Sequence, residues 1–291
     1  MAWLRQRDGS FCPVKTTAFV GVLLPVAWIL YRFWDNDLGP RPVTEVIHFS
    51  GDWAVRLLWI TLAVSPFARI FRSGKLLLPR RLLGIASFAY VFAHLFLYVV
   101  DQKFDLITVA SEIVLRFYLT IGFVAVVGLA VLAATSTDKM CGRLGRRWNS
   151  LHKLVYPIAI LAVIHFLLQR KNDIYQPTLM LGFLIWLLGY RIMQRRTREV
   201  SLISLTGLAI VSAALTAVFE VGWYYFRTGV QAQHVFWANF DFEYEFRPVW
   251  WVLAAGISVV VAAWLWRIRP QIKRANTPRA SSGATRVQSA S

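Results

Sequence analysis

Residues 136–166 read STDKMCGRLGRRWNSLHKLVYPIAILAVIHF, and this stretch joins a basic, glycine-containing loop to an apolar run. The run is long enough to enter a bilayer, and it carries His152 where it begins and His165 near its end. Thirteen residues of α-helix rise about 20 Å, so the two imidazoles are expected near opposite faces of one membrane. Ionisable residues inside a membrane are rare and mostly functional, and imidazole is a common metal ligand. The stretch therefore predicts a membrane helix whose histidines are candidates for ligand binding.

The composition of the whole chain predicts an all-α, polytopic membrane helical bundle. Of the 291 residues, 57% are hydrophobic and only 16% are charged, whereas a soluble domain averages roughly 25% charged. The net charge of +17 could suggest nucleic acid. The basic residues, however, gather in short segments between apolar runs, as the positive-inside bias requires. We therefore expect contact with membrane lipid and no nucleic-acid partner.

Eight apolar segments of about the length that a bilayer requires are predicted to be spans. They are residues 16–34, 47–71, 82–100, 117–135, 151–168, 178–193, 202–224 and 249–266. Basic connections alternate with neutral or acidic ones, apart from a weakly basic turn at 169–173, which places both termini in the cytoplasm. The first span lacks a small-x-small cleavage site and is expected to stay as an anchor.

The remaining segments are assigned by composition. Residues 1–15 form a short basic N-terminus, and the acidic connection at 101–116 is expected to be a loop. The basic tail at 267–291 is rich in Ser and Ala and lacks apolar periodicity, which predicts disorder. No internal repeat of fixed period is predicted.

Helix depth brings together histidines from two different spans. His94 lies about twelve residues into a span that starts on the cytoplasmic side, so it and His165 come to similar depth, roughly 18–20 Å along their helices. Two facing imidazoles suit bis-His coordination of a haem iron, although packing or a proton relay is an alternative. His152 has no histidine partner at its own depth. Thirteen residues before His94 stands Arg81, beside Arg80, and an arginine could clamp haem propionates or a flavin phosphate.

Other candidate residues favour simpler roles. His48 begins a span at the outer face and is expected to form interfacial hydrogen bonds, although an outer haem edge could be near; His234 is expected to be a surface residue. Cys12 and Cys141 lie in cytoplasmic segments, where thiols stay reduced. The segment RLGRRW at 143–148 lacks the spacing and lysine of a phosphate loop. No GxGxxG follows a strand pattern, so no dinucleotide domain is expected. If the chain moves electrons, they must arrive from another protein or a quinone and leave to another partner, and the chain would have no independent substrate-converting site.

Three motifs resemble one known family. TSTDKMCGRLGRRWNSLHKLVYPIAILAVIHF at 135–166, PRRLLGIASFAYVFAHL at 79–95 and FYLTIG at 117–122 are similar to the haem-binding membrane subunits of the periplasmic methionine sulfoxide reductase system, the MsrQ family. These subunits belong to the ferric-reductase-like transmembrane superfamily. The resemblance covers about residues 18–196, and it implies a six-span haem-binding domain at 16–199. The chain departs from the pattern by adding two spans at 200–266, joined by an aromatic periplasmic segment that could dock the partner or form an interfacial belt.

The resemblance implies an electron-transfer subunit in the bacterial inner membrane. It would be a b-type cytochrome with one or two haems, with FMN as a further cofactor. Its donor would be the quinone pool or a cytosolic flavin reductase, and its acceptor a periplasmic molybdenum-cofactor methionine sulfoxide reductase that repairs oxidised envelope proteins. The haem ligands implied are His94, His165 and His152. Candidates for contacts with an anionic cofactor or a donor are Arg80, Arg81, Arg146 and Arg147.

Two other functions remain open from the sequence. The same haem scaffold could serve a ferric or quinone-linked transmembrane reductase. A non-redox transporter or scaffold would use the histidines only for packing.

Overall fold

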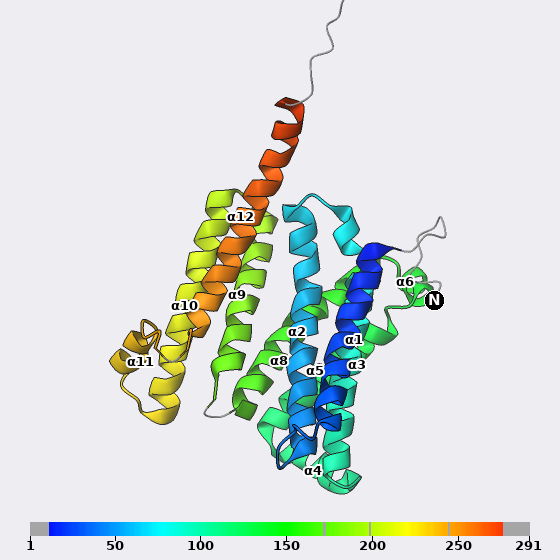
Figure 1. Cartoon of the computed structure of the whole chain (residues 1–291). Helices are drawn as coiled ribbons and strands as arrows, with labels where there is room; N and C mark the ends of the chain where they lie inside the picture. Colours follow the sequence, from blue (N-terminus) through cyan, green and yellow to red (C-terminus); the bar gives the residue numbers. More distant parts are fainter. Residues whose placement is uncertain (1–11, 171–172, 198, 244, 276–291) are drawn as a thin grey trace, which may run out of the picture.

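The computed structural model describes residues 12–170, 173–197, 199–243 and 245–275, with side chains up to residue 268. Eight long helices match the eight predicted segments, and the all-α fold is confirmed (Figure 1). They are α1 (Pro13–Trp34), α2 (Pro42–Ile70), α3 (Arg80–Asp101), α5 (Phe117–Ala134), α8 (Val155–Arg170), α9 (Tyr175–Arg196), α10 (Leu202–Thr228) and α12 (Pro248–Ala275). The predicted N-terminal segment lies outside the described residues up to residue 11, and so does the tail from 276 onwards. The last helix continues past Trp266 to Ala275, where the tail was expected to be disordered.

Two helical hairpins form the centre of the molecule. α2 packs along α3, and α5 packs along α8, while α1 lies against the first hairpin. Polar side chains join these helices inside the bundle: Ser87 Oγ donates to the Ala54 carbonyl at 3.0 Å, and Tyr90 Oη donates to the Val22 carbonyl at 2.7 Å. Such bonds matter between membrane helices because lipid offers no competing partner for a buried hydroxyl.

The C-terminal helices form a three-helix unit beside the hairpins. α10 and α12 pack on α9 and on each other, and α9 in turn packs on α2 and α8 (Figure 1). The approach is close where small residues meet: a Cβ added to Gly182 would lie 2.4 Å from Thr216 Oγ1, and one added to Gly256 would lie 2.5 Å from the Ala209 Cβ. Small residues at such crossings are typical of helix packing in membranes.

Seven helices of the described chain are long and apolar enough to cross a membrane. The sixth predicted span, 178–193, corresponds to α9, which falls outside this set. It carries polar residues such as Gln176, Thr178 and Arg191, and its neighbours α2, α8, α10 and α12 shield it from the surroundings. A helix covered by protein on several sides does not need a fully apolar surface. The chain is a multi-pass membrane protein.

Short helices lie at the two ends of the bundle. The connection at 101–116, which the sequence predicts as a loop, contains the helix α4 (Leu106–Leu115); this expectation was wrong. Asp105 caps it, because its Oδ1 accepts from the backbone N–H groups of Ile107 and Thr108 at 3.1 and 3.0 Å. At the opposite end lie η2 (Gly74–Leu77), α6 (Asp138–Leu144), α7 (Arg146–Leu151) and η3 (His152–Leu154), while α11 (Ala232–Ala238) follows α10.

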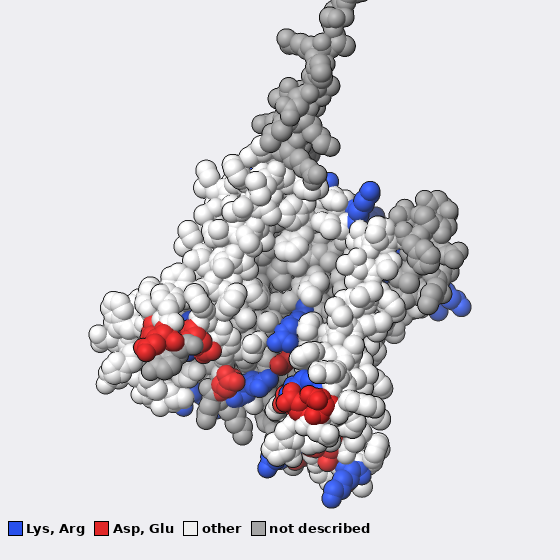
Figure 2. All heavy atoms as spheres, in the orientation of Figure 1, with Lys and Arg blue, Asp and Glu red and all other residues white. Residues whose placement is uncertain are grey.

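Charge differs between the two ends, which we call the α4 end and the α6 end. On the face seen in Figure 2, the acidic side chains lie in the lower half of the view, from the region of α11 to that of α4 in Figure 1, with basic side chains among them. The α6 end carries the basic residues Lys139, Arg143, Arg146 and Arg147.

Candidate functional site

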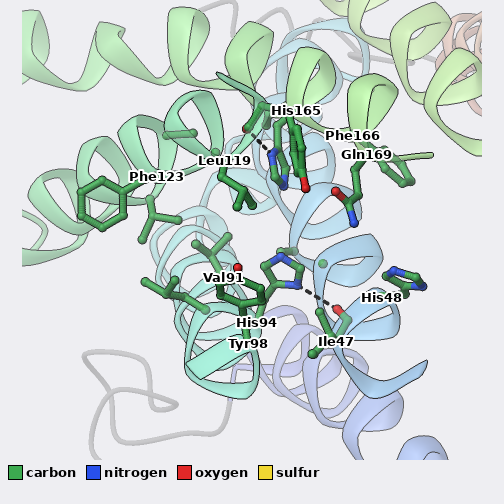
Figure 3. Close-up of a pocket in the computed structure, with 18 of the residues that line it drawn as sticks. Ile47, His48, Val91, His94, Tyr98, Leu119, Phe123, His165, Phe166 and Gln169 are labelled. Atoms are coloured by element: carbon green, nitrogen blue, oxygen red, sulfur yellow. Dashed lines mark hydrogen bonds between the residues drawn. The ribbon is translucent and has the colours of Figure 1, made fainter. Parts of the chain in front are cut away.

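His94 and His165 face each other across a cavity in the half of the bundle nearer α4 (Figure 3). His94 comes from α3 and His165 from α8. Their ring centroids lie 6.4 Å apart, and the two ring planes are nearly perpendicular, at 82°. The structure therefore brings together the two histidines that the depth argument paired.

A backbone carbonyl holds each imidazole in place. His94 Nδ1 lies 2.8 Å from the carbonyl oxygen of Ile47 on α2, and His165 Nδ1 lies 2.8 Å from that of Tyr118 on α5. A carbonyl can only accept a hydrogen bond, so each neutral ring carries its proton on Nδ1. The lone pair of Nε2 is then available on both rings, and Figure 3 shows the free nitrogens turned towards the space between them. This is how proteins prepare histidines as metal ligands.

The distance between the rings fits a single metal ion between them. An imidazole nitrogen lies about 1.1 Å from its ring centroid and a metal–imidazole bond is about 2 Å long, so two rings on one metal have centroids about 6 Å apart. In the described part of the chain, no group of three or more His, Cys, Asp or Glu side chains could hold a bare metal ion. Two facing imidazoles without further ligands would suit a macrocycle such as haem, which brings four nitrogens of its own.

The cavity has the size and lining of a cofactor site. Its volume is about 590 Å³, within the range of typical ligand pockets. Apolar side chains from all four hairpin helices form much of its wall, among them Val55, Val91, Leu129 and Phe166. A wall of this kind keeps water from a bound group.

Polar residues from α4 and its neighbours lie at one side of the cavity. Tyr98 Oη donates to the Glu112 carboxylate, and Arg116 Nη2 lies 2.6 Å from Glu112 Oε1. The hydrogen bond with the Tyr118 hydroxyl, together with the charge of Glu112, raises the pKa of Arg116 above its ordinary value, so its guanidinium stays cationic. Arg41 also lines the cavity. Sequence reasoning missed these residues because it assigned 101–116 to a loop; Asp105 before an apolar run was the available signal for a helix start.

His152 lies outside this cavity, at the α6 end. Its Nδ1 lies 3.2 Å from the Trp148 carbonyl and its Nε2 lies 3.3 Å from Ser136 Oγ. The Trp148 indole stacks on its ring with centroids 3.8 Å apart, and Trp148 Nε1 donates to the Thr135 carbonyl at 2.9 Å. Both imidazole nitrogens thus have partners within the chain.

The four candidate arginines also lie away from the cavity. Arg81 pairs with Asp138, and Arg80 lies close enough to His152 to interact with it electrostatically. Arg146 and Arg147 are exposed at the start of α7. Of the two remaining histidines, His48 lines the cavity and His234 is exposed on α11.

The bundle and the paired histidines define a class of protein, the helical membrane proteins whose facing histidines are suited to hold a haem. Comparison with known proteins agrees with this class. Residues 50–163 match the family model described as ferric reductase like transmembrane component. More specifically, the chain is 40% identical over 199 residues to the protein-methionine-sulfoxide reductase heme-binding subunit MsrQ of Xanthomonas campestris pv. campestris (strain B100), covering 66% of this chain and 91% of that protein. The MsrQ of Rhodospirillum rubrum is 39% identical over 189 residues, or 64% of this chain and 91% of that protein.

The chain therefore belongs to the MsrQ family. About a third of it lies outside the segments aligned with these relatives. No solved structure matches the chain.

Proposed function

We propose that this chain binds haem b between His94 and His165 and passes electrons across the membrane to a methionine sulfoxide reductase catalytic subunit. One observation carries the proposal: two imidazoles, each fixed through Nδ1 by a backbone carbonyl, face each other at the spacing that one iron requires. A haem bound there would supply one-electron redox chemistry. The chain's own part is to hold and orient the two ligands, to exclude water through the apolar wall, and to keep the Arg116 cation beside the cavity.

The finer assignments rest on the family and on charge. The bacterial relatives support a bacterial inner membrane, and the positive-inside bias supports an orientation with the basic α6 end and both termini in the cytoplasm. The cavity at the α4 end would then lie nearer the periplasm, where we propose a molybdenum-cofactor catalytic subunit as the acceptor. The donor, a quinol or a cytosolic flavin reductase, would approach the α6 end.

The α6 end offers fewer free ligand groups for a second cofactor than the cavity between His94 and His165 offers for the first. We keep His152, Arg80, Arg81, Arg146 and Arg147 as candidates for contact with a donor, with FMN or with a second haem. Their location at the basic end supports this role. A bound group would have to displace the Ser136 or Trp148 contact of His152 before that imidazole could act as a ligand.

Absorption spectroscopy of the purified protein tests the main proposal. After expression with ample haem, the wild type should show reducible b-type Soret and α bands, while His94→Ala and His165→Ala should each lose the same bands. Because His234 is exposed on α11, His234→Ala is a matched control that should keep them. A wild type without reducible bands would leave only the non-redox alternatives, and loss in one variant alone would refute bis-His coordination.

A second function, reduction of ferric iron, is favoured by the family model that matches residues 50–163. Stopped-flow oxidation of the reduced protein distinguishes the two. Rapid oxidation by a ferric chelate but not by the oxidised catalytic subunit would favour iron reduction; the opposite result supports methionine sulfoxide repair.

A further inference from the structure

The wall of the cavity is built twice from the same pattern. A shift of 71 residues carries His94 onto His165, and it carries Ile47, whose carbonyl holds the first imidazole, onto Tyr118, whose carbonyl holds the second. Eleven pairs of cavity-lining residues on the four hairpin helices obey this shift. They are 47/118, 48/119, 51/122, 52/123, 54/125, 55/126, 58/129, 91/162, 94/165, 95/166 and 98/169.

The prediction that the chain has no internal repeat is therefore wrong at the level of structure. Five of the pairs are identical in residue type: two glycines, two alanines, two valines, two leucines and the two histidines. Elsewhere the hairpins face different neighbours and their sequences differ, which hides the repeat from a search for periodicity. α2 and α5 both run from the α4 end to the α6 end, and α3 and α8 both return, so the repeats are parallel in the sense seen in some transporter folds.

Each half of the repeat places a glycine beneath its histidine. A Cβ added to Gly51 would lie 3.0 Å from His94 Nδ1, and one added to Gly122 would lie 2.6 Å from His165 Nδ1. Each glycine follows the bonded carbonyl by four residues, so the carbonyl that accepts from the imidazole is also the one that the glycine N–H reaches within its own helix.

Helix geometry explains why this position excludes a side chain. The Cα–Cβ bond in a helix tilts towards the N-terminus, so a side chain at position i+4 leans over the carbonyl of residue i. At Gly51 and Gly122 that space is filled by the imidazole of the partner helix. A methyl group there would separate the ring from its carbonyl.

We propose that Gly51 and Gly122 are paired positioning residues of the haem site. By leaving the carbonyls of Ile47 and Tyr118 open to a second donor, they fix the tautomer and the orientation of His94 and His165. They also set the two rings nearly perpendicular. This inference rests on the proposed function, because it assigns a role toward the haem that the two histidines would bind.

The simpler alternative is that the glycines only let the helices pack closely. Gly128 provides the matched control: it lies on the same helix as Gly122, in the same α5–α8 interface, and a Cβ there would lie 2.7 Å from Ile158 Cδ1. The two glycines thus differ mainly in whether a histidine or an isoleucine lies opposite. Gly207, whose added Cβ would meet nothing within 4 Å, controls for the substitution itself.

The experiment measures haem occupancy and the ferric EPR spectrum of the full-length chain in detergent. Nearly perpendicular axial imidazoles should give the wild type a strongly anisotropic low-spin signal with a large gmax. Loss of a ligand's outer hydrogen bond typically weakens metal binding by about 10–100-fold, and we expect Gly122→Ala to reach this range. Gly51→Ala, with its wider 3.0 Å approach, should retain haem but shift gmax as the His94 ring turns. Gly128→Ala and Gly207→Ala should keep the wild-type signal.

Each result bears on one proposal at a time. A wild type without haem refutes the proposed function. Normal haem and an unchanged gmax in both Gly51→Ala and Gly122→Ala refute the positioning role while the proposed function stands. Equal losses in Gly122→Ala and Gly128→Ala also refute it, because they would assign the effect to helix packing. If Gly122→Ala does not fold, the gmax of Gly51→Ala decides.

Discussion

The repeated hairpin has two levels, one at the α4 end and one at the α6 end, and they differ in their side chains and contacts. At the α4 end the repeat places a histidine opposite a histidine, and both rings turn a free nitrogen into one cavity. At the α6 end the same shift of 71 residues places His152 at the position of Arg81. There the histidine bonds Ser136 and Trp148, and the arginine pairs with Asp138.

The difference shows that a duplicated scaffold does not imply duplicated sites. Among the described residues, the upstream glycine, the open carbonyl and the apolar wall occur together at the level of His94 and His165 and not at that of His152. An imidazole can act as a ligand only where its second nitrogen has no partner inside the chain, and in the described structure both nitrogens of His152 have partners. Experiments that treat the two levels alike should therefore give different results.

The largest expected difference comes from chemical rescue. His165→Gly should lose haem binding by at least about 100-fold, because even the loss of an outer partner costs about 10–100-fold. Added imidazole should restore the b-type spectrum, since the space left by the ring lies at the cavity. His152→Gly should keep the bands of the haem proposed between His94 and His165 without added imidazole. A His152→Gly protein that lacks the haem bound by His94 would contradict the separation of the two levels.

The pairing of His94 with His165 could be predicted from sequence because it needs only the helical rise and the order of the spans. The glycines beneath them could not, since nothing in either segment shows that a ring from a helix 43 residues later fills the missing side chain. The stacking of Trp148 on His152 could also have been predicted from sequence, because residues four apart share a helix face.

The long helices were likewise predictable, because runs of about 20 apolar residues have few other structures available to them. α4 was missed because its ten residues are too short to span a membrane and its flanking acidic residues suggest a loop. The available signal was Asp105, whose capping role depends on local backbone hydrogen bonds that hydropathy does not register. α9 shows the opposite case, a helix placed by its neighbours more than by its own apolar character.

A smaller effect is expected from the aromatic cover of His152. Trp148→Ala removes the stacked ring and its bond to the Thr135 carbonyl, and should lower the free energy of unfolding by about 1–3 kcal/mol. Trp148→Phe keeps a stacked ring and should cost about 1 kcal/mol, the value of the hydrogen bond. Denaturant unfolding in detergent, followed by circular dichroism, measures both.

The haem bands provide the control for this pair. They should be unchanged in Trp148→Ala and in Trp148→Phe, because the substitution lies at the α6 end. Loss of the bands at constant helical content would show that the two levels are coupled and would refute their independence.

The smallest effect concerns pH and the caps of the two end helices. The backbone N–H and hydroxyl of Thr108, which donate to the Asp105 carboxylate, hold the pKa of Asp105 below its ordinary value of 3.8. The cap therefore contributes fully above the ordinary pKa and is lost as the pH falls through the lowered one. At the other end, Thr137 caps α6: its Oγ1 accepts from the Met140 N–H at 3.3 Å, and this hydroxyl does not titrate.

Hydrogen exchange, corrected for intrinsic rates, should then show α4 losing protection below about pH 4 while α6 does not. Asp105→Asn isolates the cause, because an asparagine can still cap a helix but carries no titrating charge. This variant should remove the pH dependence of α4 while keeping the helix. Because α4 contributes Glu112 and Ile113 to the cavity, acid opening of α4 would also expose the His94–His165 level and leave the His152 level as it was. Equal loss of protection in α4 and α6, or a pH dependence that persists in Asp105→Asn, would show that the acid effect does not act through this cap.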